Sequence, residues 1–315
     1  MPTILDKQKK VINALRETTG RVEFLEEYRT GANRVMEVLR EFALPLIEMG
    51  ACIPEDVMMG VRPNPFDRLT DYPWEKLDIC PLCGTKDIKP EYQDETHSEC
   101  LRCGVLFQNP RLSPEGQARF YTSVDYRTVT GAGGKVTEGM LLTQKIRADS
   151  IADRYLGQWI KKVDRALDFG CSTGTLLDKF RKKYECEVAG VELSEVHRAY
   201  ANNGMGVSVV ATLDEVAGTF DLISLVHVLE HLPYPTDTLR RLRGMLRDDG
   251  WLLLEVPHLS KSIPHPICFC RKSLTKCLRL AGFEPEDETW YGQEGASGGN
   301  FNHMRVLARK FDGGD

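Results

Sequence analysis

The sequence predicts an α/β protein built around a doubly wound sheet of seven strands. First, RALDFGCSTGTLLDKF at residues 165–180 joins an apolar run, a turn of small residues and an amphipathic stretch, which is typical of a strand, a glycine turn and a helix. Second, strand-like and helix-like patterns alternate from residue 165 onward. Third, Glu192 ends the next predicted strand, about 20 positions beyond the turn, where an acidic residue can serve a bound nucleotide.

The alternation continues toward the end of the printed sequence. Helical patterns between the first five strands cover residues 176–184, 195–203 and 236–246. The last two strands have no helical pattern between them, so we expect an antiparallel pair at the edge of the sheet. The predicted strands are RALDF (165–169), CEVAGVEL (186–193), VSVV (207–210), FDLISLV (220–226), WLLLEVP (251–257), a run at 283–290 and MRVLARK (304–310).

The strand, turn, helix and acid together favour an adenosine-type ligand. Backbone N–H groups at the start of a helix face such a ligand, and Glu192 can reach ribose hydroxyls from the end of its strand. Nicotinamide dehydrogenases use a similar arrangement with the fingerprint G-x-G-x-x-G. From Gly170 this chain reads G-C-S-T-G-T, which fits that fingerprint poorly.

Length and composition narrow the class of protein. The 315 residues can form one full α/β domain and a smaller unit, and the net charge of −5 gives no broad basic surface for nucleic acid. We find no apolar run of about 18 residues and no signal-peptide core at the start. We therefore expect a cytoplasmic protein without membrane insertion, in which the ten cysteines do not form disulfides.

The first 75 residues are expected to be a helical segment and a linker. Apolar residues recur at three- and four-residue steps between residues 6 and 50, whereas residues 51–75 are rich in proline and turn formers. The helices have two interpretations. They could cap the protein or make a homo-oligomer, or they could bind a protein partner or the substrate.

Two C-x2-C pairs follow the linker. Cys80 and Cys83 stand in CPLCG, Cys100 and Cys103 stand in CLRCG, and sixteen residues separate the pairs. This spacing predicts four thiolates around one structural Zn²⁺ with no open coordination position. His97 is close, but the four sulfurs fill the shell, so we expect His97 to face solvent. Chelation of the zinc is expected to unfold this ribbon alone.

Histidines follow the fourth and fifth predicted strands. His227 and His231 come after the fourth strand, and His258 and His265 come after the fifth. Both loops lie at the carboxyl ends of parallel strands, where α/β sheets bind ligands. Histidine can remove a proton near neutral pH, so all four are candidate catalytic residues. His197, on the helix after Glu192, is expected to be exposed.

The loop after the fourth strand has three interpretations. His227, Glu230 and His231 have the spacing i, i+3 and i+4, so they fall on one face of a helical turn. They could hold a divalent ion that acidifies a substrate hydroxyl. A histidine could instead act directly as the base, or His231 and Glu230 could make hydrogen bonds that only shape the loop.

A pair of tyrosines lies between the cysteines and the main sheet. Tyr121 and Tyr126 stand five positions apart, just before the GAGGK loop and a helical pattern at residues 138–160. Their rings could close over a ligand, or they could pack this helix on the main domain. GAGGK lacks the spacing of a phosphate-binding loop, and we interpret it as a hinge.

Five stretches occur in a fixed order along residues 165–310: LDFGCSTG, GVELS, FDLISLVHVLEHLPYP, LRDDGWLLLEVPH and HPICFCRKSLTKCLRLAGFEP. Together they resemble the motifs of class I S-adenosylmethionine-dependent methyltransferases. The resemblance implies a Rossmann-like sheet and S-adenosylmethionine (SAM) as cofactor.

The resemblance also implies roles for individual residues. Glu192 would bind the ribose, Asp168 would brace the turn, and adenine would lie beside Leu193. Ser172 stands where the family usually has a glycine, and Ala211 stands where it often has an acid, so adenine recognition there would use the backbone. The implied cofactor contacts are Asp168, Gly170, Cys171, Ser172, Gly174, Glu192, Leu193, Thr212 and Leu213, with Tyr121 and Tyr126 as further candidates.

Two narrower resemblances concern the acceptor. The loop is similar to the metal-binding E-x-x-E-H loop of ubiquinone-pathway O-methyltransferases, with His227 in place of the first glutamate, which implies a second divalent ion at His227, Glu230 and His231. A zinc ribbon, then NPR at 109–111, then the two tyrosines resembles bacterial methyltransferases of glycan and secondary-metabolite pathways. That likeness implies methylation of a hydroxyl on a sugar, glycan precursor or related small metabolite.

Two other functions remain open. The ribbon could dock RNA or protein for methylation, although its acidic excess disfavours contact with phosphates. The protein could also be a non-catalytic SAM-binding scaffold. The expected organisation is a helical segment and linker at 1–75, a zinc ribbon at 76–112, and a methyltransferase domain at 113–315 with a helical lid at 113–162.

Overall fold

A mixed sheet of seven strands organises this computed structural model, which describes residues 71–91, 94–123, 135–261, 265–294 and 300–311. The strand order is β12-β13-β10-β9-β6-β7-β8. The neighbours from β10 to β8 run parallel, whereas β13 is antiparallel to both β10 and β12. The strands are β6 (Arg165–Phe169), β7 (Glu187–Val191), β8 (Ser208–Val210), β9 (Phe220–Val226), β10 (Leu246–Pro257), β12 (Phe283–Glu294) and β13 (Asn300–Lys310).

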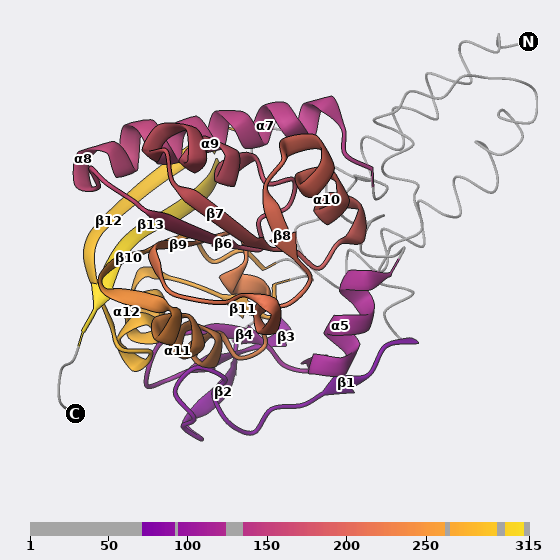
Figure 1. Ribbon diagram of the computed structural model, residues 1–315. Coiled ribbons are helices and arrows are strands. Elements are labelled where there is room, and N and C mark those ends of the chain that lie inside the picture. Colours follow the sequence, from indigo (N-terminus) through magenta and orange to yellow (C-terminus); the bar gives the residue numbers. More distant parts are fainter. Residues whose placement is uncertain (1–70, 92–93, 124–134, 262–264, 295–299, 312–315) are drawn as a thin grey trace, which may run out of the picture. The chain divides into compact units, whose positions relative to one another are not determined.

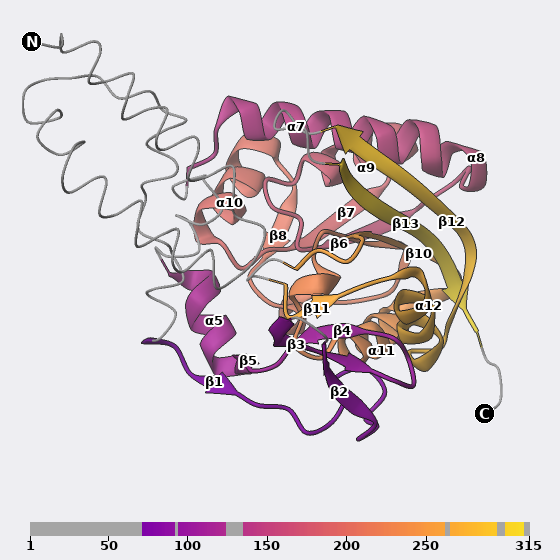
Figure 2. The same cartoon turned by 180° about the vertical axis from the view of Figure 1, so that it is seen from behind.

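Helices cover both faces of the sheet. In Figure 1, α7 and α9 lie on one face and α11 and α12 lie on the other, and Figure 2 shows the same layers from behind. The helices are α7 (Glu138–Asp149), which continues through a π-helical stretch (Ser150–Leu156) into α8 (Gly157–Trp159), then α9 (Thr175–Tyr184), α10 (Glu195–Tyr200) with a π-helical end (Ala201–Met205), α11 (Pro235–Met245) and α12 (Arg271–Leu280).

The strands and helices predicted from residue 165 onward are confirmed, with shifted ends. FDLISLV has the bounds of β9, whereas β10 begins five residues before its predicted start at residue 251, at Leu246. The helical pattern at 138–160 and the antiparallel pair at the sheet edge are also confirmed. Five of the seven residues of β9 are apolar because this central strand is largely buried on both faces.

A second, four-stranded sheet contains the cysteine pairs. Its order is β11-β4-β3-β2, and β11 comes from the chain after β10, where Ile267 pairs with Phe107. A strand from the far half of the chain therefore completes the sheet of the ribbon. The strands are β2 (Ile88–Glu91), β3 (Asp94–Cys100), β4 (Leu106–Gln108) and β11 (Ile267–Cys268), and β1 (Trp74–Glu75) pairs with β5 (Arg111–Leu112) ahead of α5 (Pro114–Thr122).

The ribbon shares its interior with the main sheet. Cys80, Cys100 and Cys103 belong to the same buried apolar cluster as Leu252 of β10 and Leu274 of α12. In Figure 1 the ribbon strands lie beside α11 and α12. The contacts of the chain group Tyr72–Asp315 into one unit, so no break in packing separates residues 76–112 from the residues that follow.

Two polar contacts fix the ribbon to the loop after β9. The fully buried side chain of Arg111 donates from Nη1 to Pro233 O at 2.7 Å and from Nε to Glu75 Oε1 at 2.8 Å. Thr236 Oγ1, at the start of α11, donates to Leu82 O at 3.3 Å. The ribbon is thus attached to the segment that carries His227 and His231.

The predicted helices within residues 6–50 lie outside the described residues. Among the residues that are described, no helix is long and apolar enough to cross a membrane. None of the described cysteines forms a disulfide.

Candidate active site

The turn after β6 has the backbone geometry of a ligand cradle. Gly170 and Gly174 have φ values of 81° and 76°, in the left-handed region that favours glycine. The N–H groups of Gly170 and Cys171 both donate to Val191 O, at 2.8 and 3.0 Å, which ties the turn to the end of β7. A Cβ on Gly170 would lie 2.4 Å from Val228 Cγ2, so only glycine lets the turn approach the loop after β9 this closely.

Glu192 connects the turn to the end of β7. Its Oε2 accepts from Ser172 N at 2.9 Å and its Oε1 accepts from Ser194 N at 2.7 Å. These two bonds fix the carboxylate next to the turn and leave further lone pairs on both oxygens. The geometry therefore fits the predicted role of binding ribose hydroxyls.

Asp168 lies beneath the turn, 3% exposed, and accepts a 2.6 Å hydrogen bond from Ser224 Oγ of β9. Burial raises the pKa of Asp168 to about 7, the Ser224 bond opposes this shift, and the nearby charge of Glu192 adds to it. The carboxyl thus joins two neighbouring strands at the floor of the site.

A cavity lies between the turn and α7. Gln144 and Arg147 line it from α7, opposite Gly170, Cys171 and Ser172. Gln144 Nε2 donates to Ser172 Oγ at 3.0 Å, and its Oε1 accepts from the buried Thr173 hydroxyl. The sequence predicted a helical lid here but not these two residues, because polar side chains on one face of a helix usually indicate only solvent.

His197 was predicted to be exposed, and the structure corrects this. Its ring is half-buried, with Nδ1 3.2 Å from Ser172 Oγ. The N-cap of α10, Ser194, directly follows the strand end that carries Glu192, so the first turn of the helix brings His197 back toward the glycine turn. Ser172, which replaces a glycine of the family pattern, is therefore bonded to side chains from two helices.

The residues predicted to flank adenine lie at the ends of β7 and β8. Leu193 is 58% exposed, and Leu213 is buried. Thr212 is exposed and forms a capping box with Glu215. Tyr126 lies outside the described residues.

His227 occupies a strained and highly charged position. Its φ of 54° is in the left-handed region, which costs energy for a residue other than glycine. Nε2 lies 3.2 Å from Glu255 Oε1 and Nδ1 lies 3.5 Å from Glu230 Oε1. Burial alone would lower the pKa of His227, but the two carboxylates outweigh burial and raise it. Both ring nitrogens face carboxylates, so His227 is poorly placed to take a proton from a substrate.

The partners of Glu255 were missed by the sequence analysis. Arg305 of β13 donates from Nε and Nη2 to Glu255 Oε2 at 2.9 and 2.7 Å, and the two residues are paired in the sheet register. Arg147 Nε lies 3.6 Å from Glu255 Oε1, and His303 packs edge-on against His227 with ring centroids 4.8 Å apart. The sequence did contain a signal for this ion pair, because Glu255 and Arg305 are charged residues within the otherwise apolar runs WLLLEVP and MRVLARK.

Of the other candidate catalytic histidines, His231 and His265 lie together, whereas His258 lies apart from them. The ring centroids of His231 and His265 lie 4.7 Å apart, and both residues share a group with Glu230. Tyr121 OH lies 2.9 Å from His231 Nδ1, so this tyrosine contacts the histidine loop. Burial lowers the pKa of His265 to about 4, and the charge of His231 adds to this shift. His258 lies outside this cluster.

In the predicted metal set, Glu230 Oε1 lies 3.5 Å from His227 Nδ1 and 3.9 Å from His231 Nε2, but the two histidines belong to different compact groups. His227 groups with Glu255 and His303, whereas Glu230 and His231 group with His265, each set having its ligand atoms within 4.8 Å of one another. The reason is that His227 still follows the extended strand, while residues 229–231 form a short 3₁₀ turn that faces the loop after β10.

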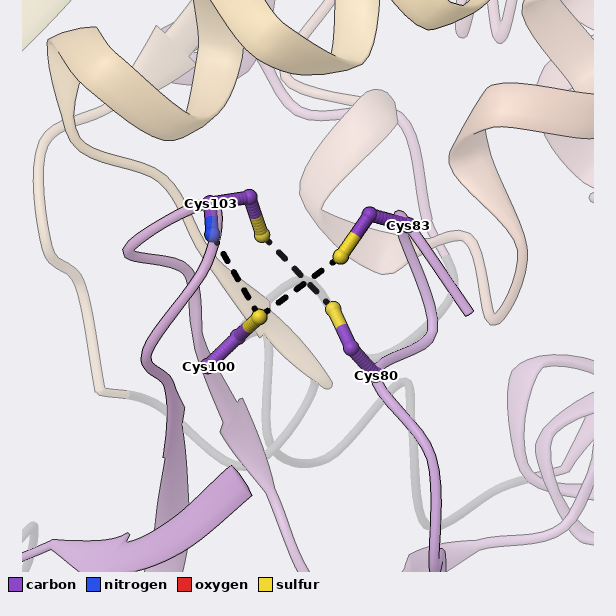
Figure 3. A group of neighbouring side chains, drawn as sticks. All are labelled: Cys80, Cys83, Cys100 and Cys103. Carbon is purple, nitrogen blue, oxygen red and sulfur yellow. Dashed lines mark hydrogen bonds between the residues drawn. The ribbon is translucent and has the colours of Figure 1, made fainter. Parts of the chain in front are cut away.

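The four cysteines of the ribbon point toward one another in Figure 3. The Sγ atoms of Cys80 and Cys103, and those of Cys83 and Cys100, are 3.6 Å apart, and all four lie within 4.8 Å of one another. Four sulfurs around one Zn²⁺ with bonds of about 2.3 Å would be about 3.8 Å apart. The donor set and its spacing therefore fit a structural zinc ion.

His97 contradicts the expectation that it faces solvent, because it is only 5% exposed. It pairs with Gln108 where β3 meets β4, and its Nδ1 lies 2.9 Å from Thr96 Oγ1. Sheet pairing buries the side chain, which sequence spacing alone did not reveal.

Comparison with known proteins identifies the main sheet and its ligand turn. Residues 144–288 match the model of a family described as a methyltransferase domain. The chain carries a class I SAM-dependent methyltransferase domain. The matched residues include the glycine turn, Glu192 and the cluster of Glu230, His231 and His265, whereas the four cysteines precede them and His303 and Arg305 follow them.

Curated relatives of this methyltransferase domain are distant. An uncharacterized methyltransferase of Schizosaccharomyces pombe is 27% identical over 141 residues, which are 39% of this chain and 51% of the relative. The ubiquinone biosynthesis O-methyltransferase of Bordetella avium is 26% identical over 30% of this chain and 46% of the relative. That of Actinobacillus pleuropneumoniae is 30% identical over 35% of this chain and 52% of the relative. The chain thus spans about half the length of the curated relatives it matches.

Among solved structures, the 1,6-didemethyltoxoflavin-N1-methyltransferase of Burkholderia thailandensis is similar. It has a TM-score of 0.49 and 21% sequence identity, and the alignment covers 71% of this chain and all of that one.

Proposed function

We propose that this protein transfers the methyl group of SAM to a hydroxyl of a sugar, glycan precursor or related small metabolite. The observation that carries the proposal is the contact between the glycine turn and the histidine loop at Gly170 and Val228. A methyl donor held by the turn and Glu192 would lie beside the cluster formed by Glu230, His231 and His265. Donor and acceptor groups at one edge of the sheet are what an aligned transfer requires.

Transfer from SAM breaks the methyl–sulfur bond and forms a methyl–oxygen bond as S-adenosylhomocysteine departs. The hydroxyl proton must leave at or before the transition state. His227 faces two carboxylates, so we assign proton removal to the cluster of Glu230, His231 and His265. The name O-methyltransferase of several relatives supports an oxygen acceptor.

The ribbon supports this activity without taking part in the chemistry. We propose that its four thiolates hold Zn²⁺, which leaves no open coordination position and hence no catalytic role. The ribbon stabilises the acceptor side through Arg111 and through the pairing of β11 with β4. The alternative of RNA or protein docking would need an exposed face of the same ribbon.

Incubation with SAM that carries a labelled methyl group tests the proposal. Purified protein is mixed with cell extract separated into glycan, small-molecule, nucleic-acid and protein pools. We expect label in the glycan or small-molecule pool. Label in RNA or protein would overturn the acceptor class, and SAM binding without transfer to any pool would favour a scaffold.

A matched pair of variants tests the cofactor site in the same preparation. Glu192→Gln is expected to weaken SAM binding about 10- to 100-fold, because hydrogen bonds to a charged group contribute about 1.5–3 kcal/mol. Glu195→Gln changes an exposed acid three residues away and should leave the affinity unchanged. Equal SAM affinities of the two variants would refute the assignment of Glu192.

A further inference from the structure

Glu255, near the end of β10, is a fully buried carboxylate that three basic side chains share. Arg305 donates from Nε and Nη2 to Oε2 at 2.9 and 2.7 Å. The other oxygen, Oε1, lies 3.2 Å from His227 Nε2 and 3.6 Å from Arg147 Nε. Arg305 alone matches the negative charge of Glu255, as a buried carboxylate requires. The contacts of Oε1 therefore do more than neutralise a charge, and they connect two parts of the site.

His227 is held by both the main chain and the side chain of Glu255. His227 N donates to Glu255 O at 2.8 Å, directly beyond the parallel pairing of β9 with β10. The φ of 54° at His227 ends the extended course of β9, and the ring lies with Nε2 beside the carboxylate. A residue other than glycine keeps such a conformation only where its surroundings hold it. The carboxylate of Glu255 thus supports the first residue of the loop after β9.

Arg147 connects the same carboxylate with the cavity between the glycine turn and α7. It lies on α7, three residues beyond Gln144, and both side chains line this cavity. The side chain of Arg147 is 28% exposed, so water could hydrate the guanidinium without an ion pair. Arginine has many rotamers, and a fixed anionic partner limits them before any ligand enters the cavity. Contact with Glu255 therefore prepares Arg147 as part of the cavity wall.

Arg305 is itself fixed by two elements. It is the direct partner of Glu255 in the antiparallel register of β10 and β13. Its guanidinium carbon also lies 5.2 Å from the ring centre of Tyr155, in the π-helical stretch that continues α7. The ion pair is thus attached both to the sheet and to the helix that carries Arg147.

The ion pair is not needed to hold β10 and β13 together. Leu253 and Leu307 form an apolar pair in the same register, two positions along each strand and therefore on the same face of the sheet. A buried ion pair contributes little net stability, because the loss of hydration offsets most of the attraction. Stability alone therefore does not account for a charged pair at Glu255 and Arg305.

We propose that Glu255 is a positioning residue for both sides of the site. Arg305 holds its carboxylate, which in turn fixes Arg147 at the cavity and His227 at the start of the loop after β9. The consequence for methyl transfer rests on the proposed function, in which a donor in the cavity must align with an acceptor beside His231. Glu255 acts through its two neighbours and takes no part in the transfer itself.

Replacement of both partners in the intact, zinc-loaded protein separates positioning from stability. Glu255→Met combined with Arg305→Met leaves an apolar pair between the strands, so the thermal unfolding temperature should stay near that of the wild type. We expect the affinity for S-adenosylhomocysteine, measured by calorimetry, to fall about two- to tenfold, because the freed Arg147 must be ordered on binding. Hydrogen exchange in residues 227–231 should become about fivefold faster or more, because a strained residue loses its support.

The effect on affinity must depend on Arg147. Arg147→Met should weaken S-adenosylhomocysteine binding by itself, and the double replacement at Glu255 and Arg305 should add no further loss in that background. An additive loss would show that the carboxylate acts on the cofactor by another route and would overturn the proposal. Asp248→Asn with Lys310→Gln is the matched control. This pair, 3.0 Å apart, joins the same two strands, and its loss should change neither measurement.

A shorter carboxylate keeps the test valid if the double replacement unfolds. Glu255→Asp retains the charge that Arg305 needs but withdraws the carboxylate from Arg147 and His227, so it should show both effects in smaller measure. Wild-type affinity together with wild-type exchange, in a folded variant of either kind, would overturn the proposal.

These measurements need no methyl acceptor, so their failure and that of the proposed function can be told apart. Labelled methyl groups in the small-molecule pool, together with unchanged binding and exchange in the variants, would retain the function and refute the positioning role. Weaker binding and faster exchange, with no transfer to any pool, would support the positioning role and refute the function.

Discussion

The two regions that we propose as the cofactor side and the acceptor side of the site are built in different ways. The glycine turn, Asp168 and Glu192 come from one continuous stretch, residues 165–192. The acceptor side combines α5, the loop after β9, the loop after β10 and strand β13. A binding motif that is local in sequence can be recognised in sequence, whereas an assembled cluster depends on every element that holds its parts together.

The largest expected effect comes from removing the zinc that we propose for the ribbon. Structural zinc contributes on the order of 10 kcal/mol to folding, comparable to the whole stability of a domain. Cys80, Cys100 and Cys103 share a core with Leu252 and Leu274. We therefore expect chelation to unfold the entire unit from Tyr72 to Asp315 in one transition, contrary to the sequence-based expectation of local unfolding.

The fluorescence of the four tryptophans, which include Trp251 in β10 of the main sheet, and far-ultraviolet circular dichroism can follow this transition together. Cys186→Ser removes a buried thiol outside the ribbon and is the control that retains zinc. Two separate transitions would show that the ribbon and the main sheet fold independently.

A smaller effect, on the cofactor side, comes from Asp168. Its pKa of about 7 in the native protein exceeds the value of 3.8 expected in the unfolded chain. Between these two values the native state binds more protons than the unfolded state, so stability falls as pH rises from about 4 to 7 and stays reduced above pH 7. The loss amounts to about 4 kcal/mol.

Asp168→Asn should remove this part of the pH dependence. Denaturant titration at several pH values gives the free energy of unfolding of the wild type and of the variant. The difference between the two free energies should change between about pH 4 and pH 7. Parallel curves for the two proteins would contradict a raised pKa. Ser224→Ala, which removes the hydrogen bond that opposes the shift, should steepen the pH dependence.

The smallest expected effect comes from replacing Arg111, and it should change one side of the site while leaving the other side unchanged. Arg111→Met removes the hydrogen bonds to Pro233 and Glu75 and should cost about 2 kcal/mol. Amide hydrogen exchange in residues 227–234 should become about tenfold faster or more, since about 1.4 kcal/mol corresponds to a factor of ten. Exchange in residues 170–174 should stay unchanged.

Arg119→Met, on the exposed face of α5, is the matched control and should alter neither segment. Faster exchange throughout the main sheet in Arg111→Met would show that the ribbon supports both sides of the site equally.

Periodicity explains why most of the fold was predictable. Five of the seven residues of FDLISLV are apolar because β9 is central in the sheet. The small residues after RALDF predict a turn that needs positive φ. The cofactor side was predicted for the same reason, since its spacing is fixed by one strand, one turn and one helix. Glu192 therefore lies where the spacing placed it.

The acceptor side was only partly predictable because its contacts join residues far apart in sequence. The histidines were recognised by their positions after strands, but nothing in the sequence showed that His227 would face Glu255 or that His265 would meet His231. The ion pair of Glu255 with Arg305 follows from the register of β10 and β13, which periodicity does not specify. His97 was misjudged because its burial depends on pairing with β4.

The pairing of β11 with β4 has a consequence for how the chain is made. During synthesis β4 emerges from the ribosome about 160 residues before its partner strand β11. At about 5–20 residues per second, the edge of β4 therefore stays unpaired for roughly 10–30 s. An uncovered strand edge is prone to pair with other chains during that time. Early metal capture by the cysteines would hold the nascent ribbon in shape, so zinc supply during synthesis would determine the yield of the finished protein.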